Sequence, residues 1–335
     1  MNLELEQLAT ANALPAAWDK LAGEYYQTRE FLLHAERYNP CRQRYYLAWQ
    51  DGVLQAGMVV YTLVLDMFTY SFIRLPLSMN IAGISCSVSA SGFIGDPALL
   101  ADMFALVKPR EKGFLILLNL DSPVNLPQTV CGPTLPTLVM NAGYASWQDY
   151  TYSLRASYRR RLAIIEKAWQ GVTAIKGSCS GFSPEMYGQY MSVLSRTKGK
   201  LETLPYEFFR NLPGNFTLTT YYHGERLLGW HITASWQAKL YFFLGGFDYQ
   251  VHAGFHSYFN LLGNILQEAI AGRFPHLELG QTAETPKLRL GGELRHKWMA
   301  GYHSNWFIRL MLHALRGMLA YKENFPPAHP FKEPQ

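Results

Sequence analysis

The chain has 335 residues, of which 49% are hydrophobic and 16% are charged, and its formal net charge is +5. This composition excludes a disordered chain and supplies enough apolar residues for one large domain or two modest ones. The mild basic excess would help an anionic ligand approach, but it is too small to indicate a dedicated nucleic-acid binder.

The cysteines and the apolar runs predict where the protein is found. The four cysteines are far apart and form no CxxC pair, which argues against a disulfide framework or a zinc ribbon and favours reduced thiols. The N-terminal sequence MNLELEQLAT is acidic and lacks the order of a signal peptide. The longest apolar runs, such as Met58 to Leu65, are shorter than the ~20 residues that a membrane-spanning helix needs. We therefore expect a soluble, cytoplasmic protein.

Two stretches of the chain share a predicted strand–turn–strand pattern. Residues 44–65 contain two β-rich runs about a turn at Gly52, and residues 216–236 repeat the pattern about Gly224. A second glycine follows five residues later in each copy, at Gly57 and Gly229. Either the glycine pairs coincide by chance, or each half of the chain is a copy of one domain built on an antiparallel meander.

The second half adds further predicted elements in chain order. After a segment rich in Pro, Gly and Asn at 122–144, a helix is predicted from about residue 154. The meander then continues with a strand at 240–246, a helix at 258–271 and a strand at 276–279. The residues of the first helix that should face the core are Leu154, Tyr158, Leu162, Ile165 and Trp169.

The last predicted element is a C-terminal helix over residues 306–321. It is apolar around most of its circumference, which favours burial between other elements. Its basic residues Arg309, His313 and Arg316 also permit docking on a membrane surface or a partner. We expect burial.

Several motifs are candidates for chemistry. The sequence RASYRRRLAIIEK concentrates basic residues on one helix, which is either an anion-binding surface or an ordinary solvated face. The sequence GSCSG has the spacing of a nucleophile elbow around Cys179, but a flexible loop fits better because the next helix starts late. His252 and His256 have the spacing of metal ligands, although Gly254 weakens a helix there, so no metal site is predicted. Neither GxxxxGK[ST] nor GxGxxG occurs.

The sequence LELGQTAETPKLRLGG at 277–292 is unusually rich in polar groups for a connection between elements. Together with YEFFRNL, GGFD, FNLLGNILQEAI and SLRASYRRRLA, it resembles the GNAT-fold N-acyltransferases related to the Fem-type (FemAB-like) aminoacyltransferases. These proteins carry two GNAT-like domains in tandem. The resemblance covers about residues 145–303 well and the first half more loosely. The Arg-rich helix and the pattern G-Q-T-x-x-x-x-K-x-x-x-G are its more specific parts.

The fold class that we predict is α+β, with two tandem GNAT-like domains of mostly antiparallel mixed sheets flanked by helices. The strand order of the second half supports it independently. We expect an N-terminal domain over residues 1–145 and a C-terminal domain with the probable catalytic cleft over residues 146–335.

The resemblance implies transfer of an acyl or aminoacyl group from an activated donor to an amine acceptor, without a covalent enzyme intermediate. The co-substrate would be acyl-CoA or aminoacyl-tRNA, with no tightly bound cofactor and no metal. In GNAT enzymes the third meander strand, here Leu240–Leu244, lends backbone N–H groups to the acyl carbonyl. The pyrophosphate motif [R/Q]-x-x-G-x-[G/A] is not matched by QVHAGF at 250–255, which argues against ordinary acetyl-CoA as the donor.

The resemblance also implies roles for individual residues. Lys287 would neutralise a donor phosphate or the developing oxyanion, as opposed to being a solvated lysine, and Gln281 and Thr282 would hydrogen-bond a substrate. Glu278 and His231 are the candidate bases, with Glu284 and Asp248 also chemically eligible. The remaining predicted donor or substrate contacts are Arg159, Arg160, Tyr241, Gly245, Asn260, Arg289 and Gly291.

Two non-catalytic alternatives remain open. One is an RNA-binding or tRNA-binding module that uses the Arg-rich helix. The other is a protein that docks on a membrane or an enzyme complex through its C-terminal helix, since peripheral membrane contact is compatible with the absence of a transmembrane segment from the sequence.

Overall fold

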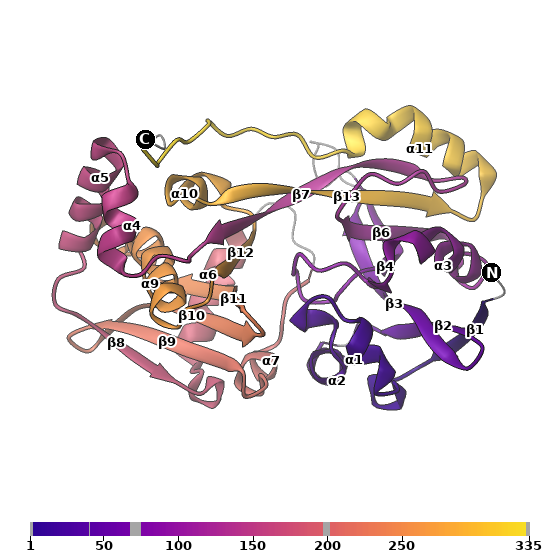
Figure 1. Ribbon diagram of the computed structural model, residues 1–335, viewed down its shortest axis with the longest axis horizontal. Coiled ribbons are helices and arrows are strands. Elements are labelled where there is room, and N and C mark those ends of the chain that lie inside the picture. Colours follow the sequence, from indigo (N-terminus) through magenta and orange to yellow (C-terminus); the bar gives the residue numbers. More distant parts are fainter. Residues whose placement is uncertain (1–2, 40, 68–74, 197–201, 333–335) are drawn as a thin grey trace. The chain divides into compact units, whose positions relative to one another are not determined.

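A computed structural model describes residues 3–39, 41–67, 75–196 and 202–332. The chain forms two compact units from interleaved segments. Unit 1 comprises residues 1–136, 198–208 and 296–323, and unit 2 comprises residues 137–197, 209–295 and 324–335. Figure 1 colours the chain along its sequence and labels most of the elements used below.

Unit 1 is built on a mixed sheet with the strand order β1-β2-β3-β4-β6-β13, and β5 pairs with β3. All neighbours in this order are antiparallel except β4 and β6, which are parallel. The strands are β1 (Glu4–Leu8), β2 (Arg44–Gln50), β3 (Val53–Asp66), β4 (Pro76–Ala82), β5 (Phe93–Gly95), β6 (Phe114–Leu120) and β13 (Glu293–His303). The helices are α1 (Ala17–Leu21), α2 (Arg29–Tyr38), α3 (Leu100–Val107) and α11 (Trp306–Leu319), with short 3-10 turns η1 (Ala11–Ala13), η2 (Tyr25–Gln27) and η3 (Pro97–Leu99).

Unit 2 repeats this topology, with the strand order β8-β9-β10-β11-β12-β7. Again one neighbouring pair is parallel, β11 with β12, and the others are antiparallel. The strands are β8 (Val172–Gly177), β9 (Phe216–His223), β10 (Arg226–Trp236), β11 (Lys239–Phe247), β12 (His276–Gln281) and residues 137–141 of β7 (Val130–Asn141), whose first part belongs to unit 1. The helices are α4 (Trp147–Ser153), α5 (Ala156–Lys167), η4 (Cys179–Gly181), α6 (Pro184–Arg196), α8 (His252–Phe255), α9 (Ser257–Ala271) and α10 (Glu284–Arg289). The short helix α7 (Tyr206–Arg210) begins in a segment of unit 1 and ends in unit 2.

The final strand of each sheet comes from the other half of the chain. β7 follows the strands of unit 1 in sequence but pairs with β12 of unit 2, and β13 follows unit 2 but pairs with β6 of unit 1. The sequence pattern contains no signal for this exchange, because strand pairing between distant segments depends on tertiary packing. The boundary expected at residue 145 stays a prediction.

The predicted duplication is confirmed by the matching strand orders. Gly52 and Gly224 both lie in tight turns with positive φ, +75° and +59°, which only glycine adopts readily. Gly57 lies directly against the ring of Trp18, and Gly229 lies against the main chain of Gly246. In both strands a side chain would collide with a neighbour, which explains the second glycine of each pair.

Two helices cover opposite faces of the unit 2 sheet. Trp230 and His231 are consecutive in β10, so their side chains point to opposite faces. The Trp230 indole donates to the carbonyl of Met186 in α6, whereas His231 lies beside Glu268 in α9. α5 packs on α9 within one apolar core that includes Leu162, as its predicted helical spacing required.

The C-terminal helix was predicted to be buried, and that prediction is wrong. Only Leu312 of α11 is buried, and five of its large apolar side chains are exposed. One helix can bury only the face that meets its neighbours, and here apolar residues continue beyond that face. Among the described residues, no helix is long and apolar enough to cross a membrane.

Candidate functional site

The parallel strands β11 and β12 of unit 2 pair along only part of their length. They are paired at Lys239↔His276, Leu240↔Leu277 and Tyr241↔Glu278, and β11 then continues to Phe247. On its other edge, β11 has an irregularity where Phe243 is the extra residue between Phe242 and Leu244. A bulge displaces the backbone amides around it from regular pairing, and bulges are frequent beside active sites. The irregularity lies within Leu240–Leu244, the stretch predicted to bind the acyl carbonyl, and that role stays a prediction.

A second irregularity lies in β12, opposite the first. The register of β12 against β7 shifts between Glu278 and Gly280. The chain then passes through three left-handed residues in four, Gly280 (φ +69°), Thr282 (φ +59°) and Ala283 (φ +50°). Positive φ is unfavourable for a β-branched threonine, so this turn is strained. Strain of this kind persists only where surrounding contacts hold it.

Lys287 provides those contacts. Its Nζ donates to the main-chain oxygens of Gln281, at 2.8 Å, and Gly280, at 3.2 Å. An ammonium has three N–H groups, and among the described residues the third has no acceptor. The side chain is only 2% exposed, so the alternative of a solvated lysine is wrong. Lys287 belongs to α10, a short helix where the sequence predicted only a polar connection.

Burial changes the chemistry of Lys287. It lowers the pKa of the ammonium to about 7, although the charges of Glu284 and Glu278 oppose this shift. A lysine that changes charge near neutral pH, with a donor left over, is typical of functional sites. An anionic ligand placed beside it would accept a hydrogen bond from the unused N–H.

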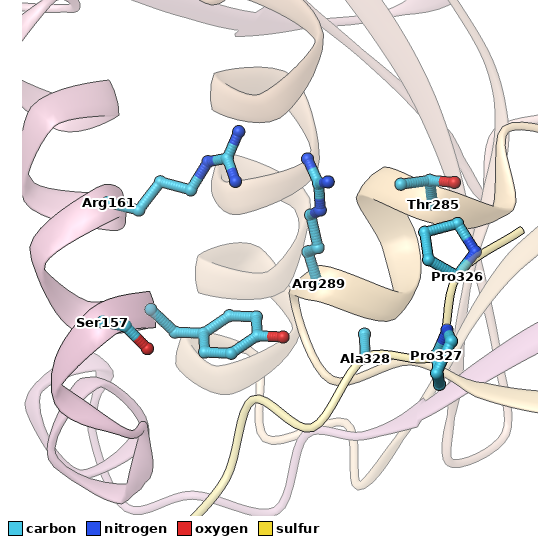
Figure 2. Close-up of a pocket in the computed structure, with 8 residues that line it drawn as sticks. Ser157, Arg161, Thr285, Arg289, Pro326, Pro327 and Ala328 are labelled. Atoms are coloured by element: carbon cyan, nitrogen blue, oxygen red, sulfur yellow. The ribbon is translucent and has the colours of Figure 1, made fainter.

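A pocket of about 250 Å³ opens beside the same helix. Figure 2 shows Arg161 reaching toward it from α5 and Arg289 from α10, with Thr285 and Pro326 on the opposite wall. No hydrogen bond or ion pair engages either guanidinium within the described ranges. Two unpaired guanidiniums form a strong site for a phosphate or carboxylate. The lining residues are Ser157, Tyr158, Arg161, Thr285, Arg289, Pro326, Pro327 and Ala328.

The C-terminal segment forms one wall of this pocket and is fixed to unit 2. The main chains of Arg155 and Pro330 are hydrogen-bonded at 2.8 Å, and the main-chain N–H of His329 donates to the Tyr158 hydroxyl at 3.3 Å. The ring of Phe331 lies against Gly291, whose φ is +97°. The close approach predicted for Gly291 is therefore made by the protein's own Phe331.

The structure brings some of the predicted site residues together. Lys287, Glu278, Glu284 and Gln281 lie around the strained turn, and Arg289 follows on α10. Thr282 is exposed in the turn itself. The predicted contacts did not include Arg161, Ser157, Tyr158 or Thr285, although the i, i+3 spacing of Tyr158 and Arg161 places them on one flank of α5.

His231 belongs to a separate buried network. Its Nδ1 lies 3.3 Å from the Tyr221 hydroxyl and its Nε2 lies 3.5 Å from Glu268, which also forms an ion pair of 2.6 Å with Lys176. Burial lowers the pKa of His231, while Glu268 opposes the shift. At 1% exposure, its ring is occupied by protein neighbours.

Other predicted contacts have partners within the fold. Asp248 accepts from Arg226 at 2.6 Å, and the Asn260 amide donates to the carbonyls of Phe255 and Ile165. Arg159 donates to the Leu154 carbonyl at 3.2 Å. Tyr241 is buried in β11, and Arg160 is exposed. Gly245 lies so close to the Trp230 carbonyl that a side chain there would be tightly packed against it. Their roles toward a substrate stay predictions.

The remaining motifs have structural explanations. Cys179 lies in η4, and burial raises the pKa of its thiol to about 12, which leaves it unreactive as a nucleophile near neutral pH. Within the described residues, no group of three His, Cys, Asp or Glu could hold a metal ion. Gln250, at the position of the pyrophosphate motif, accepts from Arg226 at 3.0 Å, and α8 occupies the residues that follow it.

Comparison with known proteins places these features in context. Residues 153–298 match the family described as Acetyltransferase (GNAT) domain. FemX matches with a TM-score of 0.55 and 11% identity, over 92% of this chain and 99% of FemX. The C-terminal domain of a putative lysylphosphatidylglycerol synthetase from Agrobacterium fabrum matches with a TM-score of 0.50 and 8% identity, over 77% of this chain and 84% of that domain. No curated protein matches the sequence. At these identities the structural matches establish the fold alone.

Proposed function

We propose that this protein, an acyltransferase of the GNAT superfamily whose family domain spans residues 153–298, transfers an acyl or aminoacyl group from an activated donor to an amine. Its Fem-type tandem GNAT fold carries the site in unit 2. The observation that supports this assignment most strongly is the pair of irregular strand ends beside Lys287. The bulged strand β11 supplies displaced backbone amides, and the strained turn after β12 holds a buried ammonium with one unused donor.

The proposed reaction is a direct transfer. The amine nitrogen of the acceptor attacks the acyl carbonyl carbon, and the carbonyl oxygen becomes an oxyanion. The bond from that carbon to the sulfur or ribose oxygen of the donor then breaks, and a base passes the proton that the amine loses to the leaving group. Backbone amides of β11 and the third N–H of Lys287 stabilise the oxyanion. No covalent enzyme intermediate forms.

Glu278 is the base that we favour for the amine proton. It lies on β12 at the last residue that pairs with β11, it is half-buried, and its charge acts on Lys287. His231 is less suitable because its ring nitrogens face Tyr221 and Glu268. A base must reach the reacting amine, so position decides between candidates with eligible chemistry.

The donor is proposed to carry a phosphate that binds between Arg161 and Arg289. Both acyl-CoA and aminoacyl-tRNA contain phosphate esters, and either would be available in the cytoplasm that the sequence predicts. The unmatched pyrophosphate motif and the engagement of Gln250 by Arg226 argue for a donor other than acetyl-CoA. The acceptor is a small-molecule or peptide amine.

Donor binding tests the proposal. The protein is titrated with acetyl-CoA, a long-chain acyl-CoA and aminoacyl-tRNA, and the Arg161→Ala and Arg289→Ala variants are measured beside Lys167→Ala. Lys167 is an exposed cation on the same helix that does not line the pocket, which makes it a matched control. We expect both pocket variants to weaken binding of one donor class about tenfold, as loss of a charge-assisted bidentate contact should, and Lys167→Ala to leave acyl-CoA binding unchanged.

The arms of the titration separate the donor sources. If Arg159→Ala and Arg160→Ala also weaken binding, and do so with aminoacyl-tRNA but not with either acyl-CoA, the donor is aminoacyl-tRNA. If RNA without an amino acid binds as tightly and no acceptor is modified, the protein is a non-catalytic RNA-binding module. If no donor of the three classes binds, the proposed function is wrong.

A further inference from the structure

The outward face of α11 is apolar rather than polar. At 100° per residue, Trp306, Phe307, Leu310 and Met311 lie on one side of the helix with Ala314 and Met318. Trp306 is 68% exposed, Leu310 59% and Phe307 55%. Soluble proteins rarely leave a continuous stripe of large apolar side chains on a helix open to water, so an exposed stripe indicates a binding surface.

The opposite face holds α11 on unit 1. Leu312 is buried and Ile308, Leu315 and Leu319 are partly buried. The Asn305 side chain caps the first turn by accepting from the Phe307 N–H at 2.8 Å. The helix is therefore a folded element with a fixed orientation on its unit, and its apolar stripe faces away from its own core.

Positive charge flanks the apolar stripe. Between Trp306 and Leu319 the helix contains Arg309, His313 and Arg316 and no acidic residue. Arg309 is fixed by a hydrogen bond of 3.0 Å to the His303 carbonyl and by its position over the Tyr302 ring. Arg316 and His313 are exposed.

A second group of cations lies at the start of the helix. Ser304, which precedes the helix cap, is hydrogen-bonded in both directions to Gly113, at 3.0 and 3.1 Å. This contact fixes the preceding loop beside α11, and that loop contains Lys108, Arg110 and Lys112. Its one acid, Glu111, is buried in an ion pair of 2.8 Å with Arg44. Arg110 and Lys112 are exposed, whereas Lys108 is half-buried over the Tyr302 ring, so the loop presents two cations to the solvent beside the N-terminal end of the helix.

We propose that α11 lies flat on an anionic membrane surface. Trp306, Phe307, Leu310 and Met311 would enter the boundary between headgroups and acyl chains, and Arg316 with the loop cations would meet lipid phosphates. At 14 residues the helix is about 21 Å long, too short to cross a ~30 Å hydrocarbon core. An apolar stripe alone would suit a protein partner equally, and the uniformly cationic flank is what selects a lipid surface.

Vesicle co-sedimentation of the full chain tests this proposal. Vesicles of phosphatidylcholine alone are compared with vesicles that also contain phosphatidylglycerol, for the native protein and for a Trp306→Ser/Phe307→Ser/Leu310→Ser variant. A Val53→Ser/Ile175→Ser variant is the matched control, because both side chains are more than half exposed but lie elsewhere. Circular dichroism establishes that each variant is folded.

The proposal requires that the native protein and the control sediment with anionic vesicles and that the triple variant bind at least tenfold more weakly. Arg316→Ala should weaken binding about fivefold, and added salt should weaken it further. Three outcomes overturn the proposal: no binding to anionic vesicles, equal binding by the triple variant, or a native dimer that the triple variant converts to monomer. The last outcome would assign the stripe to contact between copies of the chain.

Discussion

The two units of this protein share one topology but differ at the ends of their parallel strands. In unit 1, β3 and β4 pair in continuous register from Val60↔Ala82 to Asp66↔Pro76. Beyond the parallel pairs of β4 and β6, the Asn119 amide of β6 donates to the Val88 carbonyl at 2.8 Å and closes the region with the protein's own loop. In unit 2, the corresponding strand is bulged at Phe243, and a buried ammonium with an unused donor occupies the turn after β12.

This difference teaches that a duplicated fold does not duplicate its site. In unit 1 the polar group beside the strand ends is the Asn119 amide, and its hydrogen bond to the Val88 carbonyl stabilises the loop. In unit 2 the polar group is the Lys287 ammonium, which has one N–H without an acceptor among the described residues and changes charge near neutral pH. Its burial costs stability but suits the binding of an anion. On this proposal unit 1 is a structural counterpart, and unit 2 carries the acyl-transfer site.

The pH dependence of stability should show the largest contrast between the units. Burial raises the pKa of Glu202 in unit 1 from 4.5 to about 7 and lowers that of Lys287 in unit 2 from 10.5 to about 7. The folded state binds the extra proton at Glu202, so the free energy of unfolding should fall as pH rises from 4.5 to 7, by roughly 3 kcal/mol. At Lys287 the unfolded state, rather than the folded state, binds the extra proton between pH 7 and 10.5. The free energy of unfolding should therefore rise over this range, by on the order of 5 kcal/mol.

Urea denaturation over this pH range measures both effects. Glu202→Gln should abolish the fall in the free energy of unfolding between pH 4.5 and 7 and leave the rise between pH 7 and 10.5 unchanged. Lys287→Met should abolish that rise and leave the fall unchanged. If both variants retain the native pH profile, the two groups do not titrate as their burial requires.

Acyl transfer should depend on unit 2 alone. Lys287→Met keeps the length of the side chain but removes the ammonium, and we expect kcat/KM to fall about 10²–10³-fold, as for loss of one oxyanion donor. In the native enzyme kcat/KM should fall as pH rises above about 7, because the ammonium loses its proton there. The matched unit 1 change, Asn119→Ala, should cost roughly 1–3 kcal/mol of stability through unpaired buried carbonyls, but leave kcat/KM of the folded enzyme intact. Equal losses of activity in both variants would remove the functional distinction between the units.

Two glycines offer a comparison of packing. Gly57→Ala in unit 1 would force a methyl group against Trp18, and Gly291→Ala in unit 2 would force one against Phe331 at a positive φ. Each should lower the free energy of unfolding by roughly 1–3 kcal/mol. Only Gly291→Ala should also weaken donor binding, because Phe331 holds the chain segment that lines the pocket. Calorimetry with donor titration separates the two effects, and unchanged donor affinity in Gly291→Ala would show that the segment is not part of the site.

The smallest expected effect concerns the pocket arginines. Arg161→Lys and Arg289→Lys keep the charge but lose the planar fork, and we expect KM for a phosphate-bearing donor to rise a fewfold with kcat unchanged. A fall in kcat at constant KM would instead place these groups at the reacting carbonyl.

The sequence was sufficient for the local elements and for the repeat. Alternating apolar residues and the turn glycines Gly52 and Gly224 predicted the meander strands, because such patterns are local. The exchange of β7 and β13 was not predictable, since it is a choice between equivalent strand partners far apart in sequence. The six-residue helix α10 was missed for a different reason: it is shorter than a helical period pattern can indicate.

The candidate site was predictable only in part. The sequence indicated Lys287, but its burial and its hydrogen bonds to the Gly280 and Gln281 carbonyls arise from the strained turn. The Arg-rich helix was recognised, yet the tertiary packing of α5 on α9 determines that Arg161, rather than Arg159 or Arg160, lines the pocket. A wall made by residues 326–328 depends on where the C-terminal segment docks, which no local pattern encodes.

Hydrogen exchange with a bound, non-reactive donor analogue tests the central claim most directly. The analogue is a thioether of coenzyme A or an amide-linked aminoacyl-tRNA, whichever class binds. We predict slower exchange at residues 242–247, 280–289 and 157–161 of unit 2, and unchanged exchange at residues 76–95 and 114–121 of unit 1. Protection confined to unit 1, at full occupancy of the analogue, would contradict the assignment of acyl transfer to unit 2.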